Sequence, residues 1–237
     1  MVLQKGDFIL VDYTAKVKET NEVFDTTNEE VAKKEHLHKE GEIYEPKLIV
    51  IGEGWMLKAV DESLLTMEPA KPATVEVLPD KAFGPRDPEK IKRISLKQLL
   101  AKDVHNPTIG MRIDYGGKMA IIRSIGAGRV LLDFNPPLAG RTLVYNITVQ
   151  KKIEAAEEKA LALVHRRIPI AEAAKFKLIF EEKTMTLEMP EEAFYLEGVQ
   201  VAKRGIALDI EKFFPEVTNV RFIETFKVTP KPEIPKT

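Results

Sequence analysis

The stretch "AFGPRDPEKI", residues 82–91, marks a change in the pattern of apolar and charged residues along the sequence. Residues 82–85 carry an apolar run into a Gly-Pro pair, and such pairs are typical of turns. From Arg86 onward, a proline and a cluster of charges begin a segment with a different spacing of apolar residues. The stretch therefore indicates a junction between two structural units. The sequence on either side decides whether one unit interrupts the other.

Before the junction, apolar and polar residues alternate, as expected for half-buried strands. In "DFILVDYTAKV", residues 7–17, one face carries Ile9, Val11, Tyr13, Ala15 and Val17. Further strands are predicted for residues 22–27, 46–52 and 72–84. Residues 55–67 have apolar side chains at helical spacing, which predicts a short amphipathic helix. The polar residues 27–45 are predicted to form a long surface loop.

After the junction, residues 86–131 contain four short apolar runs. Gly116-Gly117 separates the second run from the third, and two-residue hairpin loops need the positive φ that glycine tolerates. The segment is therefore predicted to be a small all-β unit. It holds ten Lys and Arg against four Asp and Glu, a net charge of +6, which leaves −7 for the rest of a chain whose total is −1.

The pattern of the first unit returns at "NPPLAG", residues 135–140, and "TLVYNITVQ", residues 142–150. The second stretch alternates cleanly, which predicts a strand that completes the first sheet. The junction is thus the start of an insertion. The predicted domains are residues 1–85 with 132–153, an insert at 86–131, and a C-terminal domain at 154–237.

The C-terminal segment has the mixed pattern of an α+β domain. Residues 151–167 are rich in Ala and Glu and predict a helix, and Pro169 favours the start of a second helix over residues 169–176. Residues 177–182 and 184–190 predict a hairpin, and residues 190–214 predict a long helix that begins at a proline. A final strand is expected at 219–228, followed by a disordered tail at 229–237.

Composition excludes several classes of function. The net charge of −1 leaves no global field to attract nucleic acid or a membrane. The absence of cysteine excludes disulfides, thiol catalysis and cysteine-bound metals, and fits a reducing compartment. The longest aliphatic run, "LIVI", is too short for a signal peptide or a membrane span. We therefore expect a cytoplasmic protein without membrane attachment, and abundant Lys and Glu favour a hot habitat.

The order of three motifs resembles the FKBP family of peptidyl-prolyl cis–trans isomerases. These motifs are "VFDTT" at 23–27, the pair Gly52 and Gly54 followed by Asp61, and "DKAFG" at 80–84. The insert after "AFGPRDPE" and the return at "NPPLAGRTLVYNITV" make the chain similar to the SlyD-type branch, and specifically to the long archaeal FKBPs. The resemblance covers roughly residues 3–153, and residues 154–237 resemble those proteins only in layout.

The resemblance implies an α+β fold. It consists of an antiparallel FKBP half-barrel sheet wrapped on a short helix, an all-β insert-in-flap domain and a C-terminal α+β domain. The implied activity is rotation of X-Pro bonds in unfolded or nascent polypeptides. Such a rotation makes and breaks no covalent bond, so neither a cofactor nor a metal is expected. A dry apolar pocket that favours the twisted amide suffices.

The resemblance also assigns the pocket. Tyr13 and Tyr145 would form aromatic walls, and Asp25 would accept the Tyr13 hydroxyl. The Leu57 N–H would bind a substrate carbonyl, and Phe83 would overhang the rim. Tyr13, Asp25, Leu57, Phe83 and Tyr145 are thus the implied catalytic residues, and the implied substrate-binding residues are Phe24, Ile51, Met56, Val60 and Leu138.

Two positions depart from the family pattern. Phe83 stands where relatives usually carry tyrosine, so a hydroxyl that binds substrate is lost, at a cost of about 1 kcal/mol. Val60 stands on the pocket floor where tryptophan or leucine is common, and Trp55 has the wrong helical phase to replace it. An active but altered pocket is expected.

Two alternative functions remain open at this stage. The chain could be a holdase whose isomerase pocket is weakened by Phe83 and Val60. It could also be a ribosome- or RNA-associated factor that uses the basic insert, although nucleic acid is the less favoured partner and an ordinary solvated surface explains the charge as well. The C-terminal domain could serve client contact or homo-oligomerisation. His36 and His38 form an H-x-H that lacks further ligands, so no metal site is predicted.

Overall fold

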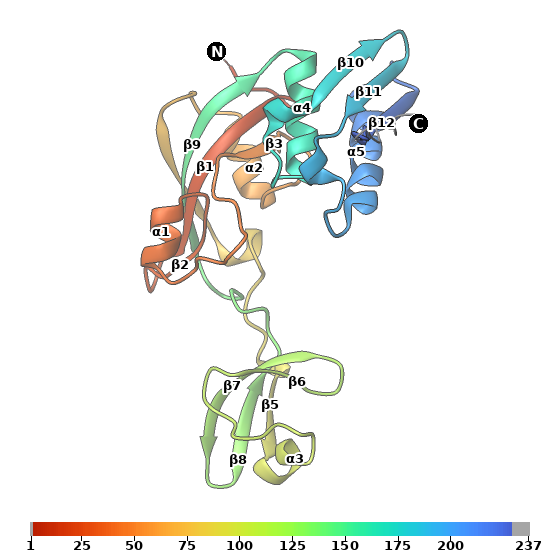
Figure 1. Ribbon diagram of the computed structural model, residues 1–237. Helices are drawn as coiled ribbons and strands as arrows, with labels where there is room; N and C mark the ends of the chain where they lie inside the picture. The colour runs from red at the N-terminus through yellow and green to blue at the C-terminus, as the bar shows by residue number, and fades with distance from the viewer. Residues whose placement is uncertain (1, 229–237) are drawn as a thin grey trace, which may run out of the picture.

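The computed structural model describes residues 2–228 and contains three β-sheets. The first sheet and the C-terminal domain lie together. The insert stands apart from them, and two chain segments without regular secondary structure form the neck that joins it to the first sheet (Figure 1). Each sheet has its own cluster of buried apolar side chains. The predicted α+β class and the three-part layout are confirmed.

The first sheet is antiparallel in the order β2-β1-β9-β4, with β3 paired to β1. Strand β9 lies between β1 and β4, so the segment after the insert does complete the first sheet, as predicted. The apolar face of this sheet packs on helix α2, whose Val60 and Leu64 are fully buried. The elements are β1 (Phe8–Val17), β2 (Val23–Thr26), β3 (Lys47–Val50), α2 (Lys58–Leu64), β4 (Pro72–Val77) and β9 (Leu143–Ile153).

The prediction of a loop throughout residues 27–45 was wrong, because helix α1 (Glu29–Lys34) forms inside it. Its N-cap is Asn28, whose side chain accepts the Val31 N–H, and Ala32 is fully buried. Acidic residues occupy the first turn and lysines the last, which suits the helix dipole. The helix buries a single side chain, so apolar periodicity could not indicate it.

The insert is a four-stranded antiparallel sheet in the order β5-β8-β7-β6. Gly116 and Gly117 both have positive φ in the β6–β7 turn, which confirms the hairpin. The prediction of an all-β unit omitted helix α3, which a capping box between Ser95 and Gln98 begins. The elements are β5 (Ile91–Ser95), α3 (Leu96–Leu100), β6 (Arg112–Asp114), β7 (Met119–Gly126) and β8 (Arg129–Asp133).

The insert extends past the predicted boundary at residue 131. Strand β8 runs to Asp133, which pairs with Ile91 of β5 and Ile121 of β7. The two chain segments of the neck then meet where the Gly140 N–H donates to the Gly84 carbonyl over 2.8 Å. The junction that opened at residues 82–91 is therefore closed by residues 133–140.

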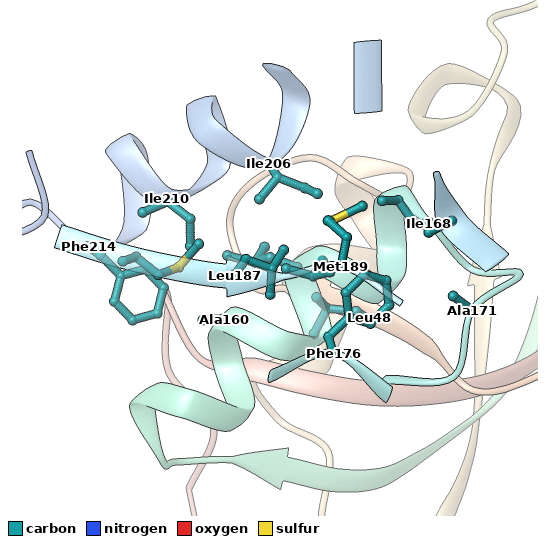
Figure 2. Close-up of a cluster of buried hydrophobic side chains, with 14 of the residues drawn as sticks. Leu48, Ala160, Ile168, Ala171, Phe176, Leu187, Met189, Ile206, Ile210 and Phe214 are labelled. Atoms are coloured by element: carbon teal, nitrogen blue, oxygen red, sulfur yellow. The ribbon is translucent and has the colours of Figure 1, made fainter. Parts of the chain in front are cut away.

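The C-terminal domain contains a β10–β11 hairpin, as predicted, and strand β12 pairs with β11 in parallel. Helices α4 and α5 pack on this sheet and on each other (Figure 2). The elements are α4 (Ala156–Arg167), β10 (Lys177–Glu181), β11 (Thr184–Glu188), α5 (Val199–Phe213) and β12 (Asn219–Ile223).

Several C-terminal boundaries differ from the prediction. Residues 169–176 form only a three-residue 3-10 turn, Ala173–Lys175. The predicted helix over 190–214 begins at Val199, because Gly198 adopts φ +76° and breaks the helical path. Residues 151–153 belong to β9, and the final strand ends at Ile223. The tail at 229–237, predicted to be disordered, lies outside the described residues.

The C-terminal domain shares a hydrophobic core with the first sheet. Phe8 and Leu48, from β1 and β3, belong to the same buried cluster as the α4 and α5 side chains, and Leu48 is visible among them in Figure 2. Phe213 of α5 contacts Phe8 edge-on at 5.2 Å between ring centroids and Trp55 at 6.1 Å. The Arg166 guanidinium stacks 3.8 Å above the Trp55 ring. These contacts fix the domain against the strands that carry the candidate site.

Candidate active site

The candidate site begins with a hydrogen bond between neighbouring strands. The Tyr13 hydroxyl of β1 donates to Asp25 Oδ2 of β2 over 2.6 Å. Thr27 holds this geometry, since its hydroxyl accepts the Tyr13 N–H at 3.0 Å and its N–H donates to the Tyr13 carbonyl at 3.0 Å. Lys47 Nζ approaches the same phenolic oxygen at 3.3 Å. Lys47 and Thr27 were not among the site residues predicted from the sequence.

Burial and the Asp25 carboxylate together raise the pKa of Tyr13 well above its usual range. Burial, and then the charge of Asp25, raises the pKa of Tyr145 to about 12. Both phenols therefore stay protonated through the physiological range. The Tyr13 hydroxyl donates to Asp25 and so holds its carboxylate at the edge of the aromatic cluster.

Aromatic side chains from three positions form one wall. Tyr13 and Tyr145 are tilted against each other with ring centroids 6.1 Å apart. Phe24 meets Tyr145 edge-on at 6.0 Å. The β1–β9 register pairs Ala15 with Tyr145, which places both tyrosines on the face that covers α2.

Helix α2 and the loop before it supply the opposite wall. Val60 and Ile51 are buried, at 0% and 2% exposure, and Met56 and Leu57 are half-buried against the same cluster. Within residues 2–228, the Leu57 N–H donates no hydrogen bond to the protein. It is thus a backbone donor at the start of α2 that remains available to a ligand.

Asp61 positions the loop that leads into α2. Its Oδ2 accepts the Gly52 N–H at 2.8 Å, whereas its buried Oδ1 has no partner among the described residues. Burial raises the pKa of this carboxyl despite that hydrogen bond. Gly52 and Gly54 both have positive φ, so the loop depends on glycine. The spacing of Gly52, Gly54 and Asp61 is visible in the sequence, where it indicates a family motif but does not predict this hydrogen bond.

The structure brings together nine of the ten predicted site residues. Tyr13, Ile51, Val60 and Tyr145 are buried in one cluster, and Phe24, Met56, Leu57 and Leu138 pack against it. Asp25 joins this group through its hydrogen bond to Tyr13. Phe83 stands apart from the cluster and is 43% exposed.

Phe83 instead lines a cleft of about 710 Å³ between the first domain and the insert. Phe24 and Leu138 line the same cleft, so it adjoins the aromatic cluster. The far wall comes from the insert and includes Arg112, Ile121 and Arg123; Figure 1 shows how the neck brings the β6–β7 end of the insert toward the first domain.

The two loop histidines have different surroundings. His38 stacks on Tyr44 with ring centroids 5.4 Å apart, and His36 adopts positive φ in the turn after α1. Across residues 2–228, no three His, Cys, Asp or Glu side chains gather in a way that could hold a metal ion. In the same range, no helix is both long enough and apolar enough to cross a membrane.

Comparisons with known proteins agree with this architecture. A family model described as "FKBP-type peptidyl-prolyl cis-trans isomerase" matches residues 2–100. Models described as "FKBP26, IF domain" and "FKBP26_C-terminal" match residues 97–138 and 156–227. Together the three models match residues 2–138 and 156–227, so strand β9 and the tail lie outside the matched residues.

Curated relatives point to the same class. The "Short-type peptidyl-prolyl cis-trans isomerase" of Methanocaldococcus jannaschii is 34% identical over 158 residues, which cover 67% of this chain and 98% of that protein. The "FKBP-type 16 kDa peptidyl-prolyl cis-trans isomerase" of Escherichia coli is 26% identical over 152 residues, 62% of this chain and 91% of the relative. The SlyD protein of Treponema pallidum is 25% identical over 125 residues, 49% and 68% of the two chains.

The fold and these relatives define a peptidyl-prolyl cis–trans isomerase. More narrowly, the chain belongs to the FKBP-type family, in its form with an inserted domain and an additional C-terminal domain.

Proposed function

We propose that this chain rotates X-Pro bonds of unfolded polypeptides at the Tyr13–Asp25 site while the insert and the C-terminal domain hold the client. The observation that carries the proposal is the 2.6 Å hydrogen bond between Tyr13 and Asp25 at the edge of an aromatic cluster. The same cluster adjoins a cleft that reaches the insert. Client capture and catalysis would then share one surface.

The chemistry requires only that the twisted amide be favoured over the planar one. The barrier to rotation is about 18–20 kcal/mol because resonance holds the peptide bond planar. In the twisted state the carbonyl is less polar, so an apolar wall of Tyr145, Phe24 and Val60 stabilises it relative to the planar state. Lowering the barrier by about 4–7 kcal/mol would accelerate rotation roughly 10³–10⁵-fold.

Three groups would orient the substrate. The Asp25 carboxylate, fixed by Tyr13, would lie beside the carbonyl carbon of the rotating amide and favour the twisted state electrostatically. The Leu57 N–H would bind a substrate carbonyl, and Met56, Ile51 and Leu138 would hold the proline ring.

We assign the insert to client capture. Its sheet has an edge strand, β6, with unpaired backbone groups, which suits addition of an extended client strand. Capture there raises the local concentration of prolines at the Tyr13–Asp25 site. Because β8 ends at Asp133, we set the insert at residues 87–134 rather than 86–131.

The C-terminal domain supplies a second exposed apolar surface. Tyr195, Val201 and Phe226 are 80%, 77% and 58% exposed. The ring centroids of Tyr195 and Phe226 are 6.4 Å apart. We propose that this surface contacts either clients or a second copy of the chain. Sedimentation of the full chain over a range of protein concentrations separates the two roles, because only self-association makes the particle mass rise with concentration.

The test of the function is isomerisation of a single-proline peptide followed by exchange NMR. Catalysed exchange that Asp25→Ala reduces, with the fold retained, supports the proposal. A chain that suppresses aggregation of an unfolded protein but leaves the exchange rate at its uncatalysed value would instead be a holdase.

A further inference from the structure

The cleft between the first domain and the insert is rich in arginine. Four arginines line it, Arg86, Arg112, Arg123 and Arg141, against two acidic residues, Glu22 and Asp133. The apolar part of the lining includes Phe24, Phe83, Leu138 and Ile121. A cleft of this composition suits a ligand that carries both negative charge and apolar groups.

Two of the arginines are already paired. Arg86 Nη2 donates to Asp133 Oδ2 at 2.7 Å, and Arg123 Nε donates to the same oxygen at 3.0 Å. Asp133 is 1% exposed, so one buried carboxylate is shared by two guanidinium groups. This trio retains a net positive charge and fixes the insert to the neck.

The other two arginines keep their full charge for a ligand. Within residues 2–228, neither Arg112 nor Arg141 forms an ion pair, and both side chains are exposed. Glu19 is near Arg141, but its carboxylate accepts the Thr142 N–H at 3.1 Å. Accepting that N–H is the main reason the pKa of Glu19 is low, and Arg141 adds only a small effect.

The charged face of the insert is turned toward the aromatic cluster. Arg112 of β6 is the cross-strand partner of Ile121 of β7, which is the partner of Asp133 of β8. Residues paired in this way share one face of a sheet. Arg112, Ile121 and Asp133 therefore lie on one face of the insert, and all three line the cleft that Phe83 and Phe24 also line.

We propose that this cleft is a client subsite that selects acidic residues close to the proline being isomerised. The occupant is an extended polypeptide whose Asp or Glu side chains meet Arg112 and Arg141 while apolar side chains meet Phe83 and Leu138. This inference rests on the proposed isomerase function, and it names the class of substrate. The selection is local, since the chain as a whole has a net charge of −1 and would not attract acidic segments through its global field.

The test uses the full chain and two fluorescent peptides of about 13 residues, which reach roughly 40 Å when extended. Both carry a central Leu-Pro, flanked on each side by glutamates in one peptide and by glutamines in the other. Binding is measured by fluorescence anisotropy and isomerisation by exchange NMR. We expect the glutamate peptide to bind about fivefold more tightly at low salt, since exposed charge pairs give modest gains. The preference should vanish near 0.5 M salt, where the screening length is only a few ångströms.

The variant Arg112→Gln with Arg141→Gln should abolish the preference for glutamate. The matched control is Arg129→Gln with Arg93→Gln, which also removes two positive charges, at exposed positions of the insert away from the lining of the cleft. This control should keep the preference for the glutamate peptide. An equal loss of preference in the control would show that the preference comes from the overall positive charge of the insert, and would overturn the proposal.

Equal binding of the two peptides, or binding of neither, also overturns the proposal. Displacement of the glutamate peptide by a single-stranded RNA oligonucleotide of higher affinity would assign the arginines to nucleic acid instead. Binding with the expected preference but without catalysed exchange would leave the subsite standing and refute the isomerase function, so the two failures are distinguishable.

Discussion

Tyr13 of β1 donates its phenolic hydrogen to Asp25 of β2 over 2.6 Å, and this contact ties the aromatic wall to the carboxylate of the candidate site. Removing the carboxylate leaves the Tyr13 hydroxyl without its acceptor in a buried setting. We expect Asp25→Ala to lower kcat/KM for a proline tetrapeptide about tenfold, with a smaller effect on the thermal midpoint. A loss of activity that follows only the loss of folded protein would contradict a role for Asp25 in the reaction.

Phe83 offers a test in the opposite direction. It is 43% exposed at the rim of the cleft, at a position where the resemblance to FKBP proteins implies a tyrosine. Phe83→Tyr should raise kcat/KM about fivefold, because a hydroxyl that binds a substrate carbonyl contributes about 1 kcal/mol. Phe83→Leu serves as the control that changes shape without adding a donor. An unchanged rate in Phe83→Tyr would place the rim too far from the substrate.

The neck contains a carboxylate whose ionisation stabilises the insert. Burial opposes ionisation of Asp133, yet hydrogen bonds from Asn135 and Arg123 and the charge of Arg86 outweigh it, so the pKa of Asp133 is lowered in the folded state. A depressed folded pKa gives stability that is present above the unfolded value, near 3.9, and is lost as the pH falls through the folded value. The insert should therefore loosen in acid.

Asp133→Asn should reproduce this loosening at neutral pH, at a cost of about 2 kcal/mol, because the arginine partners are partly exposed. Hydrogen exchange of the β5 and β8 amides should rise in the variant, and its stability should vary less than that of the parent between about pH 5 and pH 2. Identical pH profiles for the two proteins would show that Asp133 carries no such linkage.

Trp55 is the only tryptophan, so its fluorescence reports on how the C-terminal domain packs against the first sheet. It contacts the half-buried Phe213 of α5 and lies beneath Arg166 of α4. Phe213→Ala should shift the Trp55 emission to longer wavelength. It should also lower the free energy of unfolding by about 2 kcal/mol, which is less than the cost of the same change at a fully buried phenylalanine, because Phe213 is only half-buried. Val201→Ala, at a position 77% exposed on the same helix, should leave both readouts unchanged.

The sequence was most informative where a residue pattern served both local and long-range structure. Alternation identified β1 and β9, and the order of motifs grouped nine site residues that lie in or beside one cluster. Helix α1 was not predicted because it buries only Ala32. The helix predicted to begin at residue 190 begins at Val199 instead, because Gly198 adopts a left-handed conformation. The outward position of Phe83 and the pairing of Asp133 with two arginines depend on the geometry of the neck, which no local pattern encodes.

We propose that the Tyr13–Asp25 site catalyses proline isomerisation. Exchange NMR on a single-proline tetrapeptide tests it most directly, because no coupling protease is needed and the chain is used whole. Catalytic amounts of the protein should raise the cis–trans exchange rate by roughly 10³-fold over the uncatalysed reaction, which takes tens to hundreds of seconds per event. Asp25→Ala should lose most of this gain. An exchange rate equal to that in buffer alone, with folded protein in the tube, would contradict the account.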